Sequence, residues 1–247
     1  MNTLYGLSFS HPSIAARLML EQAGIDYRWV GLPLGFHPLL LRSKGFRGNT
    51  VPALVLDGRR VQGSLEISRA IEALGPPGIL FPTEPEAGRR VEEAEAWGER
   101  ELQPVSRRIF RWSMSRHGWL RKNLAKRNGV PVPAVASVLM APLAARYARV
   151  SGADDAAVRA DLAALPELID RVDELIAEGT IGGETPNAAD FQVGTSVRAI
   201  MAFDDLRPAV EGRPAEALAM RILPKYPGPV PPVVPPDWRL QPGRSSD

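Results

Sequence analysis

The 247-residue chain has no cysteine, which excludes a disulfide scaffold, a thiolate zinc site, an iron–sulfur cluster and a cysteine nucleophile. It also has little net charge, because 30 lysines and arginines offset 28 aspartates and glutamates. We therefore expect no general attraction to nucleic acid or to a membrane surface. Its three histidines have no metal-ligand spacing, so we predict no metal. No apolar run approaches the ~20 residues of a membrane-spanning helix.

The chain does contain a large apolar fraction, 45% of its residues, which is ample for a buried core. Residues 1–10 lack the basic segment of a secretion signal, and we expect a cytoplasmic protein. Prolines and glycines crowd at residues 75–78 and 82–85, and strand-like runs alternate with helix-like runs only before this boundary. The pattern predicts an α/β plus all-α fold, with an N-terminal domain at residues 1–76, a linker at 77–87, an all-helical domain at 88–222 and a proline-rich tail at 223–247.

The N-terminal region alternates strands and helices, as an α/β domain does. The predicted elements are, in order, a strand at residues 3–7, a helix at 12–23, a strand at 25–30, a hairpin at 51–62 and a helix at 64–74. Asp57-Gly58 supplies the two-residue turn of the hairpin. Residues 32–49 have no periodicity that predicts an element.

The region after the boundary has helical periodicity. Thr83 and Glu86 have the spacing of a capping box, and Asn187 with Asp190 forms a second signal for a helix start. Apolar residues at helical spacing predict helices over residues 91–109, 135–147, 158–176 and 187–200. The tail sequence PKYPGPVPPVVPP at residues 224–236 favours an extended chain that drapes over the surface or is disordered.

The element order, the pair Val51-Pro52 before a strand, the pair Gly63-Ser64 at a helix start and the segment at residues 186–191 together resemble the cytosolic glutathione S-transferase family. The resemblance covers residues 3–203. It implies a thioredoxin-like domain that binds glutathione as co-substrate, an all-helical domain that shapes the site of a small electrophile, and a homodimer. It further implies glutathione conjugation or a related reaction, with detoxification as the role.

The resemblance also assigns the glutathione-binding residues. Val51 and Pro52 match the family's cis-proline position, where the backbone pairs with the cysteinyl part of glutathione. Gly63 and Ser64 match the site of the γ-glutamyl end. The helix start at Ser64 offers a hydroxyl, backbone N–H groups and the positive end of the helix dipole to a carboxylate.

The sequence departs from the family at Gly63, where an acidic or amide residue usually meets the γ-glutamyl ammonium. Gln62 and Glu66 are the candidates that could substitute in that role. The departure also favours a rival interpretation, in which the chain is a non-catalytic binding or interaction protein that retains the glutathione S-transferase fold.

The residue that stabilises the glutathione thiolate is Tyr, Ser or Cys just after the first strand in this family. Ser10, two residues before Pro12, resembles the serine classes and is the first candidate, followed by Ser13 and then by Ser8 or Tyr5. A hydroxyl near a helix N-terminus can hydrogen-bond the thiolate and lower the pKa of the thiol. Two alternatives stay open: the site has no side-chain donor, or these serines only cap the first helix.

The strongest charge feature is a basic run at residues 107–127, interleaved with Trp112 and Trp119. Such a run usually covers a solvated helix face, which is the interpretation we favour. The functional alternatives are a site for an anionic acceptor at the domain cleft and, less favoured, a nucleic-acid contact. A P-loop, a dinucleotide fingerprint and a G-x-S-x-G elbow are all absent from the sequence.

Overall fold

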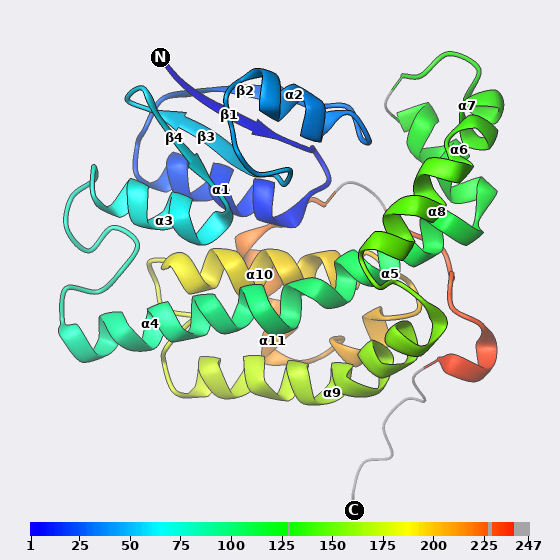
Figure 1. The fold of residues 1–247 in the computed structure, drawn as a ribbon. Coiled ribbons are helices and arrows are strands. Elements are labelled where there is room, and N and C mark those ends of the chain that lie inside the picture. The colour runs from blue at the N-terminus through cyan, green and yellow to red at the C-terminus, as the bar shows by residue number, and fades with distance from the viewer. Residues whose placement is uncertain (128, 227–228, 240–247) are drawn as a thin grey trace, which may run out of the picture.

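The computed structural model describes residues 1–127, 129–226 and 229–239, and it begins with an α/β unit (Figure 1). The elements of this unit are β1 (Asn2–Gly6), α1 (His11–Gln22), β2 (Tyr27–Gly31), α2 (His37–Ser43), β3 (Ala53–Leu56), β4 (Arg59–Gln62) and α3 (Ser64–Glu72). The strand order is β2-β1-β3-β4, with β1 parallel to β2 and antiparallel to β3, and β3 antiparallel to β4. The thioredoxin-like arrangement expected from the element order is confirmed.

The two faces of the sheet are covered differently, because side chains alternate along each strand. One face, which includes Leu4 and Leu54, joins the main core together with residues of α1 and α3. The opposite face carries Tyr5, which packs in a smaller cluster with Leu41 of α2 and with Phe46. Helices α1 and α3 therefore lie between the sheet and the rest of the molecule, as Figure 1 shows.

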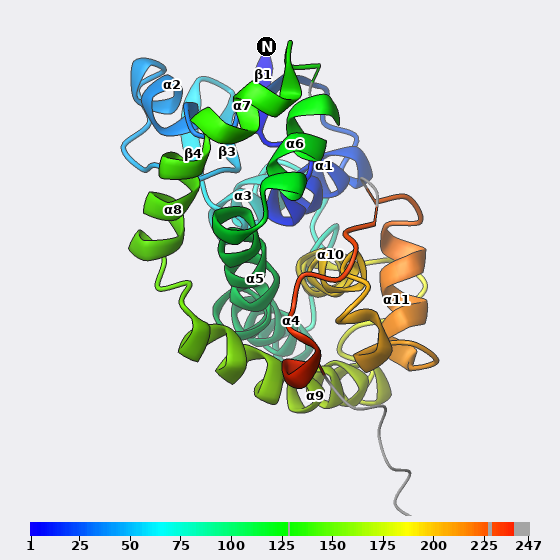
Figure 2. The same ribbon diagram turned by 90° about the vertical axis from the view of Figure 1, so that its right-hand side faces the viewer.

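The second region is helical. Its described elements are α4 (Pro85–Trp97), the π-helical turn η1 (Gly98–Leu102), α5 (Gln103–Arg116), α6 (Gly118–Arg127), α7 (Pro133–Leu139), α8 (Ala141–Val150), α9 (Asp155–Ala177), α10 (Ala188–Met201), η2 (Arg207–Ala209), α11 (Pro214–Ile222) and η3 (Pro236–Trp238). Helix α10 is almost entirely buried and contacts α1, α4, α5 and α11 (Figure 2). Within the described ranges, no helix combines the length and the apolar character needed to cross a bilayer.

The predicted capping box at the start of α10 is confirmed. The Asp190 N–H donates to the Asn187 side chain at 3.0 Å, and the Asn187 N–H donates to the Asp190 carboxylate at 2.9 Å. The Gly182 N–H is a further donor to Asp190, which is fully buried. Because a buried helix start cannot leave its N–H groups to water, these bonds stabilise the first turn of the central helix.

One helix had no sequence signal, and one predicted helix start was wrong. Helix α2 lies in the segment that showed no periodicity, since it is only seven residues long and buries little more than His37 and Leu41. The cap of α4 is Glu84 and not Thr83, because Pro85 occupies the first turn and sets Glu84 in the extended conformation that precedes it. The Glu84 carboxylate accepts hydrogen bonds from the N–H groups of Glu86 and Ala87.

The helix predicted over residues 135–147 is divided. Met140 separates α7 from α8, and Pro142 lies in the first turn of α8, where its missing N–H costs nothing. Helices α6, α7 and α8 form an arm that rises from the end of α5 beside the α/β unit (Figures 1 and 2). This arm brings residues distant in sequence toward the N-terminal domain.

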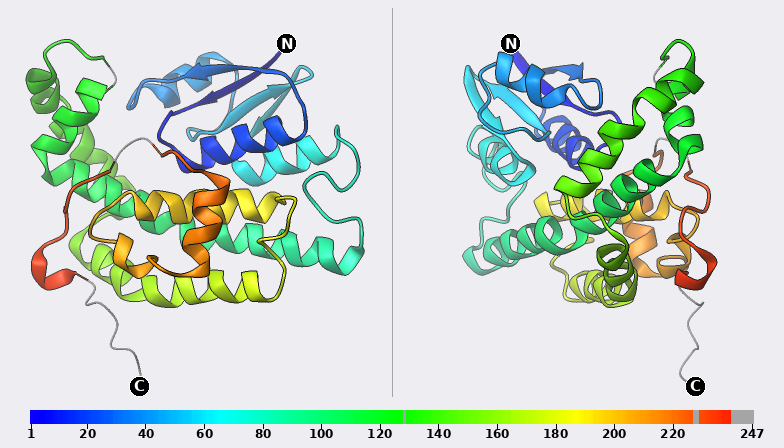
Figure 3. Two further views of the ribbon diagram at one scale, coloured as in Figure 1. Left: turned by 180° about the vertical axis from the view of Figure 1, so that it is seen from behind. Right: turned by 45° about the vertical axis from the view of Figure 1, so that its right-hand side comes forward.

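The described part of the proline-rich tail packs on the helical region. Val230 forms a bridge with Phe203, and its N–H donates to the Ala202 carbonyl at 2.7 Å. Val233 and Val234 are each 3% exposed and belong to the main core. The tail therefore does more than drape over the surface, and Figure 3 shows the path of its backbone beside the helical region from behind. Residues 227–228 and 240–247 of the predicted tail lie outside the described residues.

Candidate active site

A cavity of about 280 Å³ lies between the α/β unit and the helices. We call its lining residues between positions 7 and 64 the N-terminal wall, and those between positions 99 and 147 the helical wall. A third side is closed by the end of α10 and by the tail, where the Tyr226 hydroxyl donates to the Phe9 carbonyl at 2.7 Å. Segments from both domains and from the tail thus enclose one site.

Ser10 lines the cavity at the N-terminus of α1. Its backbone caps the helix through the Ile14 N–H, which donates to the Ser10 carbonyl at 2.9 Å, but its hydroxyl forms no capping hydrogen bond. The interpretation that this serine only caps the helix with its side chain is therefore wrong. The hydroxyl is left for a ligand near the positive end of the helix dipole.

The other hydroxyl candidates lie outside the cavity lining. Ser13 is fully buried, and its side chain packs close to Gly6 at the end of β1. Ser8 is exposed to solvent on the loop after β1. Tyr5 packs edge-on against Phe46 on the opposite face of the sheet. Among these four hydroxyls, the geometry brings only that of Ser10 to the site.

The backbone at Val51 is a free edge beside the cavity. The Val51–Pro52 peptide bond is cis, as predicted, and the Pro52 carbonyl accepts from the Gly63 N–H at 3.0 Å. Val51 lines the cavity, and no backbone hydrogen bond joins it to any described residue. An extended segment of another peptide can pair with such an edge.

Ser64 and Gly63 lie on the same wall. Ser64 is the first residue of α3 and 2% exposed, and its hydroxyl has no hydrogen-bond partner among the described residues. Together with the free N–H groups of the first helical turn, this hydroxyl forms a site suited to a carboxylate. Gly63 has a φ of 101°, a backbone conformation that L side chains rarely adopt, which accounts for glycine at this position.

Gln62 and Glu66, the two candidates from the sequence for binding the γ-glutamyl ammonium, do not line the cavity as Gly63 does. Gln62 lies outside the cavity lining, because its amide accepts from the Gly48 N–H at 2.9 Å and donates to the Thr50 carbonyl at 2.7 Å. Glu66 also lies outside the lining. The one carboxylate in the described lining is Glu99, which the π-helical turn η1 places there.

Glu99 escaped sequence analysis because no local motif marks it. Its position depends on how the helical domain docks on the α/β unit, and a π-helical turn leaves no simple periodicity. Burial raises the pKa of Glu99 above its ordinary value, Arg107 opposes the rise, and Glu66 adds to it. Glu99 is thus a partly desolvated carboxylate that faces the start of α3.

Helix α5 presents one continuous face to the cavity. The lining residues recur at the spacing of three and four that keeps side chains on one side of a helix, and they are Gln103, Ser106, Arg107, Phe110, Arg111 and Met114. The Phe110 ring lies 5.5 Å from the Phe9 ring, centroid to centroid, which joins the two walls. Arg107 and Arg111 lie one turn apart on this face.

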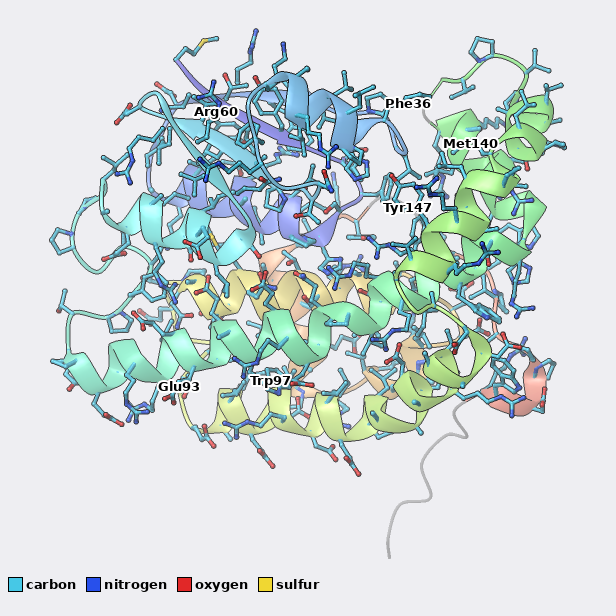
Figure 4. All side chains as sticks on the ribbon, viewed as in Figure 1. Phe36, Arg60, Glu93, Trp97, Met140 and Tyr147 are labelled. Carbon is cyan, nitrogen blue, oxygen red and sulfur yellow. The ribbon has the colours of Figure 1, made fainter. Side chains whose placement is uncertain are left out.

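Tyr147 closes the cavity from the arm. Figure 4 shows it on the side of α8 that faces the α/β unit. Its ring stacks on His37 with centroids 6.3 Å apart, and its hydroxyl donates to the Gly35 carbonyl at 3.4 Å. Residues of α8 and of the loop before α2 are thereby brought into contact across the mouth of the site.

The cavity has an unusual set of titratable groups. Burial and the nearby Arg107 lower the pKa of His11 to about 3, and burial and Arg111 lower the pKa of His37. Both histidines are therefore neutral at pH 7. Burial also lowers the pKa of Arg107 and of Arg111, although both remain cationic. In the described part of the chain, no group of three or more histidines and carboxylates could hold a metal ion.

The basic run at residues 107–127 is not simply a solvated helix face. Arg108 pairs with Asp161 and Arg116 with Asp155, both on α9. Arg121 is 8% exposed and donates to carbonyls on α5 and α7, including that of Ser137 at 2.9 Å. The interpretation as a solvated face is therefore confirmed for only part of the run, since Arg107, Arg116, Lys122, Lys126 and Arg127 are exposed and Arg121 is buried. Arg107, Arg111 and Arg127 line the cavity.

The chain matches one family by sequence. Residues 4–78 match the family described as the N-terminal domain of glutathione S-transferase. This segment contains the free edge at Val51 and the helix start at Ser64. No curated protein matches the sequence.

The fold as a whole is similar to solved glutathione transferases. Glutathione transferase F7 from Populus trichocarpa superposes with a TM-score of 0.59 at 17% identity, over 90% of this chain and 93% of that one. The theta class glutathione S-transferase from Xanthomonas axonopodis pv. citri, solved with glutathione bound, gives 0.56 at 18% identity, over 89% and 91%.

A third similar structure is the beta-etherase LigF from Sphingobium sp. strain SYK-6, with a TM-score of 0.59 at 18% identity, over 81% of this chain and 84% of that one. At these identities the likeness shows the fold. Residues 4–78 thus match the glutathione S-transferase N-terminal domain family, and the chain as a whole has the fold of the cytosolic glutathione S-transferases.

Proposed function

We propose that this protein is a glutathione transferase, which joins glutathione to a small electrophile or catalyses a related glutathione-dependent reaction. The observation that carries the proposal is the convergence of three groups on one cavity: the Ser10 hydroxyl, the free edge at Val51 and the Ser64 hydroxyl. These groups suit the thiol, the backbone and a carboxylate of one peptide-like thiol.

The proposal gives each end of glutathione a partner. The cysteinyl backbone pairs with Val51 beside Pro52, and the γ-glutamyl carboxylate lies at Ser64, with Gly63 leaving room for it. Glu99 meets the γ-glutamyl ammonium in place of the side chain that Gly63 lacks. Gln62, a candidate from the sequence, supports the loop at Thr50 instead of touching the ligand.

Ser10 is the proposed catalytic residue. Its hydroxyl donates a hydrogen bond to the glutathione sulfur and favours thiolate over thiol, with the N-terminus of α1 adding its positive potential. The thiol proton goes to solvent. The thiolate sulfur then forms a bond to the electrophilic carbon as the leaving group departs with its electron pair. In an addition, the π electrons of a C=C bond shift instead to the neighbouring atom, which takes a proton from solvent.

The test is turnover together with binding. We expect glutathione at 100 times its Kd to stabilise the protein by about 2.7 kcal/mol in thermal unfolding. We also expect wild-type protein to conjugate glutathione to 1-chloro-2,4-dinitrobenzene faster than the uncatalysed reaction. Stabilisation without turnover of any electrophile would favour the rival, a non-catalytic binding protein with this fold, which the glycine at position 63 supports. Neither stabilisation nor turnover would reject the proposal.

The remaining attributes stay predictions from the sequence and from the resemblance. They are a homodimer, a cytoplasmic location, a role in detoxification and the division into domains at residues 1–76 and 88–222, with a linker at 77–87. Sedimentation equilibrium of the purified chain tests the first of them, with twice the 26.9 kDa chain mass as the expected result.

A further inference from the structure

The α5 part of the helical wall carries two cationic side chains that the proposed glutathione site does not use. Arg107 and Arg111 lie one turn apart on the cavity-facing side of α5. Neither forms a hydrogen bond or an ion pair with any described residue. The neighbouring arginines Arg108 and Arg116 each have a carboxylate partner on α9.

This lack of partners costs the free protein most at Arg111. Arg111 is half-buried, whereas the side chain of Arg107 is more exposed, and partial desolvation lowers the pKa of each. Glu99 is near enough to Arg107 to influence its pKa, but the two do not form an ion pair. A cation that is partly desolvated and unpaired is stabilised by any anion that enters beside it.

Two neutral histidines flank the same position. His11 and His37 line the cavity together with Arg107 and Arg111, and Arg107 contributes to the lowered pKa of His11 as Arg111 does to that of His37. The His11 Nε2 and His37 Nδ1 atoms are buried and have no hydrogen-bond partner among the described residues. A neutral imidazole can donate one N–H, so each ring can contribute a hydrogen bond to an anion held by the arginines.

The surroundings of the arginine pair are apolar. Phe110 and Met114 lie on the same face of α5, and Leu120, Leu143 and Val230 approach from α6, α8 and the tail. These side chains suit the body of a ring-sized ligand. The cavity therefore combines an apolar region with two cations at a defined place.

We propose that the acceptor in this site is an apolar, ring-sized electrophile that carries an anionic group, a carboxylate or a sulfonate, and that Arg107 and Arg111 bind that group. The inference rests on the proposed glutathione transferase function and adds the chemical class of the second substrate. In the test reaction the acceptor is 4-chloro-3,5-dinitrobenzoate, and the glutathione thiolate attacks the ring carbon that bears chlorine. A C–S bond forms, the C–Cl bond breaks, and chloride leaves with the electron pair.

A binding experiment without turnover tests the inference apart from the proposed function. The probes are 3,5-dinitrobenzoate and 3,5-dinitrobenzamide, which share one ring and differ in charge. Affinity is measured by calorimetry, or by quenching of the fluorescence of Trp119, which lines the cavity. We expect the wild type to bind the benzoate at least about tenfold more tightly than the benzamide. Equal affinities would overturn the proposal.

Matched variants locate the effect. Arg107→Gln/Arg111→Gln should abolish the preference for the benzoate, and Arg111→Lys should retain part of it because the charge remains. The control is Arg146→Gln/Arg149→Gln, which removes the same charge from exposed positions on α8 outside the cavity lining and should leave the preference intact. A preference that the α5 double variant retains, or that the control loses, would contradict the assignment to Arg107 and Arg111.

Turnover of 4-chloro-3,5-dinitrobenzoate and its amide completes the test, with each kcat/KM divided by the uncatalysed rate with glutathione. We expect the α5 double variant to lower the value for the benzoate about tenfold or more and to change that for the amide little. An equal loss for both would place the arginines on glutathione and overturn the proposal. A binding preference without turnover of either compound would support the anion site and reject the proposed transferase function.

Discussion

The N-terminal wall of the cavity offers backbone groups and small hydroxyls, whereas the helical wall offers guanidinium groups and large apolar side chains. On the first wall, Ser10, Val51 and Ser64 present groups that suit a peptide with a fixed structure. On the second, side chains from α5, α6, α8 and the tail surround a space that suits a ring with an anionic substituent. Under the proposed function, the first wall would recognise the invariant co-substrate and the second would select the acceptor.

The two walls also depend on the sequence differently. The N-terminal wall uses the main chain, whose position follows from the sheet and from the starts of α1 and α3. The helical wall uses side chains, each of which can change without altering the fold. If the proposed function holds, substitutions on the first wall should therefore affect the reaction with every acceptor. Substitutions on the second should change which acceptor reacts.

The largest effect is expected for Ser10→Ala. Loss of one charge-assisted hydrogen bond to the thiolate, worth roughly 1.5 to 3 kcal/mol, should reduce turnover at neutral pH by about ten- to a hundredfold. The pH–rate profile should shift to higher pH, because the pKa of the bound thiol rises. Glutathione affinity should change much less, since Val51 and Ser64 lie elsewhere on the wall.

Ser13→Ala is the control, because Ser13 is buried outside the cavity lining. We expect it to leave the pH–rate profile unchanged. An unchanged profile in Ser10→Ala would move the role to a backbone N–H, and a shifted profile in Ser13→Ala would show that the loop after β1 rearranges on binding.

The second prediction concerns the buried His11 on the N-terminal wall. Its folded-state pKa of about 3 lies below the ordinary value of 6.5, so the unfolded chain binds a proton that the folded chain does not between these pH values. Above pH 6.5 His11 is mostly neutral in both states, so its ionisation changes the free energy of unfolding little. As the pH falls further, the unfolded chain takes up a proton that the buried His11 does not, and the free energy of unfolding decreases. Between pH 6.5 and 5 this decrease is about 2 kcal/mol.

Glu95 acts in the opposite direction, because burial raises its pKa to about 7 and its proton stabilises the folded state as the pH falls from 7 toward 4.5. The measurement is therefore a difference, the free energy of unfolding of wild type minus that of His11→Gln, taken at pH 7.5 and at pH 5. We expect this difference to be smaller at pH 5 than at pH 7.5, because the variant lacks the buried imidazole that destabilises the wild type at low pH. A difference that does not vary with pH would show that His11 is accessible to protons in the folded state.

The third prediction is about a tenfold loss of glutathione affinity in Ser64→Ala, measured by calorimetry. The hydroxyl is buried and has no partner among the described residues, so its removal should not lower the free energy of unfolding. Ser68→Ala is a matched control on the same helix, where the hydroxyl already donates to the Leu65 carbonyl at 2.7 Å. Full affinity in Ser64→Ala would place the γ-glutamyl carboxylate elsewhere.

Much of the fold and half of the site follow from local sequence signals. The turn Asp57-Gly58 predicts the hairpin, the pair Asn187 and Asp190 predicts the start of α10, and both are confirmed. Such signals are local because a turn or a cap acts on the backbone within a few residues. The cis bond before Pro52 is also confirmed, but it was expected from the family resemblance and not from a local signal.

The helical wall could not be predicted in this way. Arg107 and Arg108 are adjacent in sequence, yet one lines the cavity and the other pairs with Asp161, because successive helical residues point about 100° apart. Glu99 reaches the site through a π-helical turn, and Tyr147 reaches it from the arm. Their roles depend on how α5 and α8 dock on the α/β unit, and sequence periodicity carries no information about that docking.

The smallest effect is expected for the stability of Arg111→Gln. Arg111 forms no hydrogen bond or ion pair with described residues, and burial lowers its pKa, so the free protein gains nothing from the charge. The free energy of unfolding should therefore change by less than about 0.5 kcal/mol, or rise. Arg121→Gln is the contrast, because Arg121 donates to carbonyls on α5 and α7, and its loss should cost about 1 to 3 kcal/mol. Urea unfolding at pH 7.5 measures both. If Arg111→Gln is as destabilising as Arg121→Gln, then Arg111 stabilises the fold of the helical wall. In that case Arg111 could not change without altering the fold, and the contrast drawn above between the two walls would fail at this residue.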